Sequence, residues 1–134
     1  MTTAENAVTI KRVYEPVGDD DGLRVLVDRV WPRGVAKDAA ALALWLKEIA
    51  PSAALRKWFG HDPARWEEFV RRYRNELDRN AAAVERMCEL LRKGRVTLLY
   101  GARDATHNQA VVLRDYLGER MADRRGPLAR PDVR

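Results

Sequence analysis

The sequence predicts an α/β fold: a compact single domain with a small, mostly parallel sheet of about three strands packed with helices. Three observations lead to this prediction. Short strand-like segments stand near both ends of the chain, at residues 8–14, 23–29 and 96–100. Long amphipathic helical segments lie between the second and third of them. The 134 residues suffice for one hydrophobic core but not for two comfortable domains.

The three strands are predicted from their apolar patterns. Residues 8–14 (VTIKRVY) and 23–29 (LRVLVDR) alternate apolar and polar positions, as half-buried strands do, and the second ends at a turn with Pro32 and Gly34. Residues 96–100 (VTLLY) form a continuous apolar run, which is typical of a strand covered on both faces. About eight residues join the first two strands, whereas a parallel crossover usually needs a dozen or more. Their pairing is therefore open between parallel and hairpin.

Helices are predicted from capping residues and apolar periodicity. We expect helices over residues 39–49, stopped by Pro51, and over 52–59, between an N-cap at Ser52 and Gly60. Asp62 and a proline after it start a third helix, and residues 80–93 form a fourth. A last helix begins near Thr106 and ends at about residue 118. The domain then covers residues 1–118, and 119–134 form a loosely ordered tail rich in arginine and proline.

Composition excludes several classes of protein. Apolar residues make up 46% of the chain and charged residues 34%, and no apolar run approaches the length of a membrane helix. The N-terminus lacks the layout of a secretory signal, so we expect a cytoplasmic protein. One cysteine and two distant histidines predict no disulfide and no metal site. No cofactor is expected either, because the chain has no phosphate-binding loop and no dinucleotide-binding motif. Cys88 lies on an apolar helix face and is interpreted as a core residue.

The net charge of +5, with 20 arginines and 5 lysines, raises the question of nucleic-acid binding. Most of these cations alternate with acids at helical spacing, as in Glu68 and Arg72. That pattern is typical of a solvated helix face with local ion pairs. Nucleic acid is therefore a less favoured partner than a small molecule, although the charge alone does not exclude it.

Three stretches of the chain resemble one known family. They are RVLVDRVWPRG (24–34), APSAALRKWFGHDPARWEEFVRRYRNEL (50–77) and TLLYGARDATHNQAVVL (97–113). They are similar to the YeaO-like branch of the family numbered 488 among the domains of unknown function. The resemblance implies a compact α/β fold without a settled activity. It also implies a departure, because larger relatives carry a cysteine just after the third strand, where this chain has Gly101-Ala102-Arg103, and Thr106 stands where an acidic residue is more usual.

Polar residues cluster where the second and third strands end. Ligands of open α/β sheets bind beyond the carboxyl ends of the strands, and a helix N-terminus nearby favours an anion. Arginine pairs match the oxygens of phosphate or carboxylate. We therefore expect a pocket that binds an anionic small molecule. Its predicted ligand-binding residues are Arg29, Arg33, Arg103, Asn108 and Trp31, and its predicted catalytic residues are His107, Asp28 and Asp104.

Each of these residues also has a structural interpretation. Asp28 and Arg29, or Arg103 and Asp104, would then be ion pairs that tie loops to the sheet. His107 would cap the last helix rather than transfer protons, and His61 is assigned to fixing its loop. Trp31 would pack beneath its loop rather than stack on a ligand.

The preferred hypothesis is thus a soluble anion-binding α/β protein, with acid/base chemistry through His107 if the ligand is transformed. The alternative is a nucleic-acid-associated or regulatory binding module without catalysis. A third hypothesis is an accessory protein that acts through partner contacts and has no pocket. Ligand identity, catalysis and oligomeric state are left open at this point.

Overall fold

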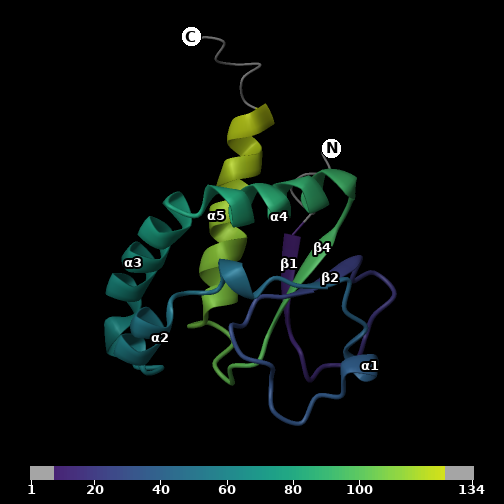
Figure 1. Ribbon diagram of the computed structural model, residues 1–134, viewed down its shortest axis with the longest axis horizontal. Helices are drawn as coiled ribbons and strands as arrows, with labels where there is room; N and C mark the ends of the chain where they lie inside the picture. Colours follow the sequence, from purple (N-terminus) through teal and green to yellow (C-terminus); the bar gives the residue numbers. More distant parts are fainter. Residues whose placement is uncertain (1–7, 126–134) are drawn as a thin grey trace.

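The computed structural model describes residues 8–125, which form an α/β domain around a four-stranded, all-parallel sheet (Figure 1). The strands are β1 (Val8–Arg12), β2 (Leu23–Leu26), β3 (Leu44–Trp45) and β4 (Val96–Tyr100), in the order β1-β4-β2-β3. β1 and β2 do not pair with each other; each pairs in parallel with β4, which lies between them. This arrangement answers the open question of the first two strands, since the segment 13–22 crosses from one side of β4 to the other.

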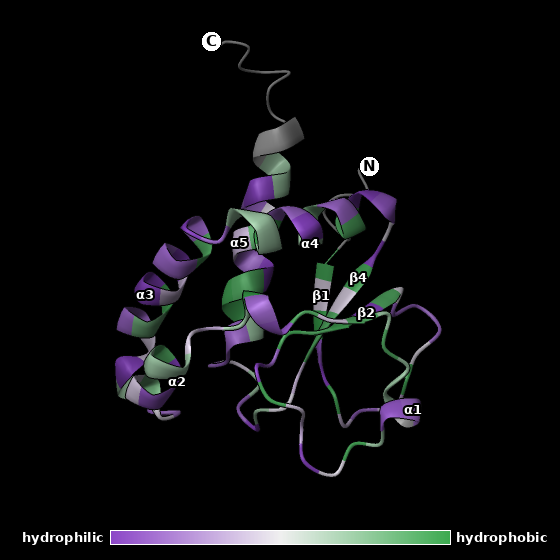
Figure 2. Cartoon of the chain, in the orientation of Figure 1, coloured by the Kyte–Doolittle hydropathy of each residue, from purple (hydrophilic) through white to green (hydrophobic). Residues whose placement is uncertain are grey.

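The alternation of residues in the strands divides the core between two faces. Val25 and Val27 of the β2 segment and Leu98 of β4 belong to the main cluster, which packs against the helices. Leu26 and Leu99 point to the other face, where they form a smaller cluster against which Trp31 and Trp45 of β3 pack. Figure 2 shows the consequence: the strands are largely apolar at the centre, while α3 and α4 carry hydrophilic residues along their lengths.

Helices cover the first face. They are α2 (Ala53–Phe59), α3 (Trp66–Asp78), α4 (Ala81–Lys93) and α5 (Gln109–Arg125), and a short α1 (Lys37–Ala40) lies in the loop on the other side. The predicted caps are confirmed: the Ser52 hydroxyl accepts the Leu55 N–H (3.1 Å), and the Asp62 carboxylate accepts the Ala64 N–H (3.0 Å). Pro63–Arg65 form one 3₁₀ turn before α3 begins.

The prediction of a helix over residues 39–49 is wrong. α1 ends at Ala40, its C-cap Ala41 has a left-handed φ of 50°, and Leu44 and Trp45 then form β3 against Val25 and Leu26. The Trp45 indole donates to the Asp28 carbonyl (2.7 Å) and packs edge-on against Trp31 at 5.3 Å. Sheet hydrogen bonds and tryptophan burial outweigh the helix propensity of an alanine-rich segment.

The last helix differs from its prediction at both ends. α5 begins at Gln109 instead of Thr106, because Asp104 accepts the backbone N–H groups of Thr106 and His107 in a turn that precedes the helix. It continues through Gly118 to Arg125, so residues 119–125 of the predicted tail are helical. Residues 126–134 of that tail lie outside the described range. Within residues 8–125, no helix combines the length and apolar character needed to cross a bilayer.

Candidate functional site

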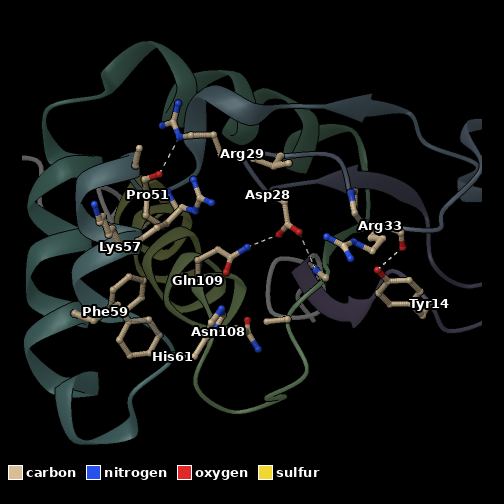
Figure 3. Close-up of a pocket in the computed structure, with 17 residues that line it drawn as sticks. Tyr14, Asp28, Arg29, Arg33, Pro51, Lys57, Phe59, His61, Asn108 and Gln109 are labelled. Atoms are coloured by element: carbon tan, nitrogen blue, oxygen red, sulfur yellow. Dashed lines mark hydrogen bonds between the residues drawn. The ribbon is translucent and has the colours of Figure 1, made fainter.

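A pocket of about 510 Å³ lies at the carboxyl ends of β1, β2 and β4 (Figure 3). Parallel strands deliver the loops of this edge to one place, and ligands of open α/β sheets bind there. The helix α2 and the start of α5 complete the wall. The lining residues are Tyr14, Asp28, Arg29, Val30, Pro32, Arg33, Pro51, Ala53, Arg56, Lys57, Phe59, His61, Phe69, Gly101, Ala102, Asn108 and Gln109.

Asp28 and Gln109 form the floor of the pocket, which we call the acceptor floor. The Gly101 N–H donates to Asp28 Oδ2 (3.0 Å), and Gln109 Nε2 donates to Asp28 Oδ1 (2.5 Å). Burial raises the pKa of Asp28 to about 6, against the opposing effects of these two donors and of the charges on Arg56 and His61. Gly101 permits this approach, because a Cβ atom there would lie 3.0 Å from Asp28 Oδ2.

Three cationic side chains from two segments surround this floor, and we call them the cationic rim: Arg33, Arg56 and Lys57. Arg33 follows β2, whereas Arg56 and Lys57 belong to α2. In Figure 3, Arg33 and Lys57 lie on opposite sides of the acceptor floor. Within residues 8–125, none of the three side chains has a hydrogen-bond or ion-pair partner, so their charges are available to a ligand.

Arg29 also lines the pocket, but its guanidinium has structural partners. Its Nε donates to the Pro51 carbonyl (3.0 Å) and a terminal nitrogen to the Ala50 carbonyl (3.2 Å). These bonds attach the segment after β2 to the start of α2. Arg29 therefore contributes positive charge to the site, but two of its guanidinium nitrogens already donate to backbone carbonyls.

The remaining wall is aromatic. Phe59 and Phe69 are buried and stacked at 4.3 Å, and His61 lies beside Phe59 at 6.0 Å between ring centres. His61 has a φ of 57°, a left-handed conformation that is uncommon outside glycine. On the other side, the Tyr14 hydroxyl donates to the Arg33 carbonyl (2.7 Å) and so ties the loop after β1 to the rim.

Four of the predicted site residues line this pocket: Asp28, Arg29, Arg33 and Asn108. Asn108 is buried and caps α5, because its Oδ1 accepts the N–H groups of Ala110 (2.9 Å) and Val111 (3.2 Å). Those two donors of the helix N-terminus are thus already occupied.

Arg103, Asp104, His107 and Trp31, the other predicted site residues, do not line the pocket. Arg103 is exposed. His107 Nδ1 lies 3.0 Å from Asp104 Oδ2, and the imidazole packs edge-on against Trp66 at 5.1 Å. The Thr106 and His107 backbone N–H groups lower the pKa of Asp104.

The Trp31 indole donates to the Val35 carbonyl (2.8 Å) within its own loop. Its ring packs with the smaller cluster on the other face of the sheet. This placement matches the structural interpretation of Trp31, in which the ring packs beneath its loop.

Several lining residues were not foreseen as ligand-binding groups, above all Arg56, Lys57 and Gln109. The sequence does carry a signal for the first two, since they occupy the last turn of a helix that the Ser52 and Gly60 caps already define. Their proximity to the ends of β2 and β4 is a tertiary property. Gln109 directly follows Asn108, which was predicted to bind the ligand. Its side chain reaches Asp28 because α5 begins at this residue, which the sequence did not predict.

The pocket lining combines charged, amide and aromatic side chains. The described lining contains cations, one carboxylate, two amides, the His61 imidazole and the Tyr14 phenol, but no cysteine, serine or threonine that could act as a nucleophile. Within residues 8–125, no three histidine, cysteine or acidic side chains are grouped so as to hold a metal ion.

Comparisons with known proteins agree with the resemblance of the sequence. Residues 7–132 match the DUF488-N3i family, which is described as the inactive DUF488-N3 subclade. The uncharacterised protein YeaO of Escherichia coli (strain K12) is 43% identical over 110 residues, which cover 82% of this chain and 96% of YeaO. The uncharacterised protein Rv3073c of Mycobacterium tuberculosis (strain H37Rv) is 42% identical over 116 residues, covering 87% and 98%. No solved structure matches significantly. The chain therefore belongs to the YeaO-like DUF488 proteins, in the DUF488-N3i family.

Proposed function

We propose that this protein binds an anionic small molecule, bearing a phosphate or carboxylate group, in the pocket at the carboxyl ends of its strands, and that it does not transform the molecule. One observation carries the proposal. The cationic rim of Arg33, Arg56 and Lys57 faces a pocket in which, among the described lining residues, Asp28 is the only acid. Unpaired cations around a concave site focus positive potential on it, which attracts an anion.

Three observations favour binding without turnover. The described lining offers no hydroxyl or thiol nucleophile apart from the phenol of Tyr14, and the family is described as an inactive subclade. The dyad of Asp104 and His107, which would suit proton transfer, lies outside the lining. Binding without turnover is the activity that this combination supports.

The acidic partners of several other arginines support a small ligand rather than a nucleic acid. Arg72 and Arg71 both contact Glu68, Arg74 forms a bidentate pair with Glu119, and Arg92 contacts Glu85. Paired cations present less net charge to a phosphate backbone, and binding to nucleic acid depends on neutralising several phosphates. The rim residues lack such acidic partners.

A thermal-shift titration tests the proposal. Inorganic phosphate and small phosphorylated or carboxylated metabolites are added to the wild type at constant ionic strength. Ligand at a hundredfold excess over Kd adds about 2.7 kcal/mol to the free energy of unfolding, which is a shift of several degrees in Tm. The variants Arg56→Ala and Arg33→Ala should weaken the shift, since each removes one unpaired rim charge.

Two further variants serve as controls. Arg86→Ala removes an exposed arginine of α4 that does not line the pocket, and should leave the shift unchanged. Arg103→Ala tests the residue that sequence reasoning assigned to the anion, and should also have little effect. If no anion raises Tm, or if Arg86→Ala reduces the shift as much as Arg56→Ala does, the pocket is not an anion site.

A further inference from the structure

The acceptor floor carries information about the ligand beyond its charge. Asp28 lines the same pocket as the cationic rim, and the charge of Arg56 influences its ionisation. An anion bound at the cationic rim is therefore brought near a carboxylate. Two like charges in one pocket repel each other, and a hydrogen-bond donor placed between them offsets the repulsion.

The floor has unused capacity to accept hydrogen bonds. Gln109 Nε2 is held by Asp28, and this bond orients the amide so that Gln109 Oε1 remains as an acceptor. Within residues 8–125, Oε1 has no hydrogen-bond partner. Each oxygen of Asp28 receives one donor, from Gly101 or Gln109, and a carboxylate oxygen can accept a second.

We propose that the ligand has two poles: an anionic phosphate or carboxylate group held by the cationic rim, and a hydroxyl group that donates to the acceptor floor. This inference rests on the proposed function and specifies the class of molecule, a hydroxylated phosphate ester or hydroxy acid. A hydroxyl donor satisfies Asp28 or Gln109 and separates the anionic group from the carboxylate. The pocket of about 510 Å³ is of ordinary size for a small metabolite.

The same geometry predicts discrimination against ligands without the hydroxyl. Such a ligand brings its charge near Asp28 with no hydrogen bond in return, and it displaces water from acceptors that it cannot satisfy. Hydrogen bonds to charged groups are among the stronger ones in proteins, and losing one commonly reduces affinity by about tenfold or more.

Calorimetric titration of matched probes tests this directly at pH 8, where Asp28 is ionised. Glycerol 3-phosphate and propyl phosphate share charge and size but differ in their hydroxyls, and glycerate and propionate form the corresponding carboxylate pair. We expect the hydroxylated member of at least one pair to bind about tenfold more tightly. The pair with the larger preference identifies the anionic group.

The variant Asp28→Asn separates this role from a structural one. It keeps the shape of the side chain but removes the negative charge, so affinity for propyl phosphate should rise while the preference for glycerol 3-phosphate falls toward one. A residue with only a structural role would lower both affinities together. Gln109→Leu, which leaves the Asp28 charge in place, should reduce the preference severalfold, and Asp19→Asn on an exposed loop should change neither affinity.

The outcomes distinguish the two levels of the proposal. If each hydroxylated probe and its partner bind equally well, and Arg56→Ala weakens both, the anion pocket stands and the two-pole ligand is refuted. If no probe binds at millimolar concentration, and inorganic phosphate does not bind either, the proposed function fails and this inference fails with it. The wild-type comparison decides the matter even if Asp28→Asn does not fold.

Discussion

Replacing Asp28 by asparagine should stabilise the protein at alkaline pH, although it alters a side chain with two hydrogen-bond partners. Burial raises the pKa of this carboxyl to about 6 in the folded state, whereas an aspartate in an unfolded chain titrates near 3.8. The folded protein therefore holds the proton more tightly than the unfolded chain does. Above pH 6 the ionised carboxylate destabilises the fold, and this penalty disappears as the pH falls from about 6 to 3.8.

The size of the effect follows from the same shift. A difference of about two pKa units corresponds to about 3 kcal/mol, which is an upper bound. Because Asp28 is partly exposed, solvent screening reduces the expected gain to about 1–2 kcal/mol for Asp28→Asn at pH 8. The amide oxygen can still accept the N–H of Gly101, so the loop after β4 keeps its attachment to β2.

Urea denaturation of both proteins between pH 4 and 8.5, followed by tryptophan fluorescence, measures this gain. The difference in free energy of unfolding should be largest above pH 7 and should shrink through the window from about 6 to 3.8. Asp19→Asn, which removes a carboxylate at an exposed position, is the matched control. A variant that is less stable than the wild type at pH 8, or a difference that does not change with pH, would refute the reasoning.

Three further predictions concern the scaffold. Gly22→Ala should lower the free energy of unfolding by at least about 2 kcal/mol, because Gly22 has a φ of +68° and a Cβ atom there would lie 2.3 Å from the Arg95 carbonyl oxygen. Gly34→Ala, in open space at a φ of +78°, should lower it by only about 1 kcal/mol, and comparable urea midpoints for the two variants would contradict this. Arg24→Met should lower the free energy of unfolding measured by thermal denaturation by about 3 kcal/mol, because it removes the buried ion-pair partner of Asp21 (2.5 Å). Lys11→Met removes a partly exposed partner of the same carboxylate and should lower it clearly less. Cys88→Ala should lower the free energy of unfolding by about 1–2 kcal/mol, because the side chain is buried. A thiol reagent should modify Cys88 far more slowly in the native protein than in urea, and rapid labelling of the native protein would contradict its burial.

The sequence predictions were correct where an element depends on residues close together in the chain. The caps at Ser52 and Asp62 and the run of β4 are confirmed, because each depends on residues within a few positions of one another. The helix prediction for Leu44–Trp45 was wrong because the structure of this segment depends on distant residues. Its alanine-rich surroundings favour a helix locally, while its actual partners, Val25 and Leu26, are about twenty residues away.

The candidate site divides in the same way. The sequence by itself determined that polar residues would gather at the strand ends, since Asp28 and Arg33 belong to the segment that follows β2 in the chain. Only the tertiary structure decided that β4 lies between β1 and β2, and that α2 brings Arg56 and Lys57 to the same edge. The tertiary structure also keeps His107 out of the pocket lining, because Asp104 holds the imidazole against Trp66 in the turn before α5. Strand order and helix docking arise from burial and pairing summed over the whole chain, and no local pattern of residues encodes that sum.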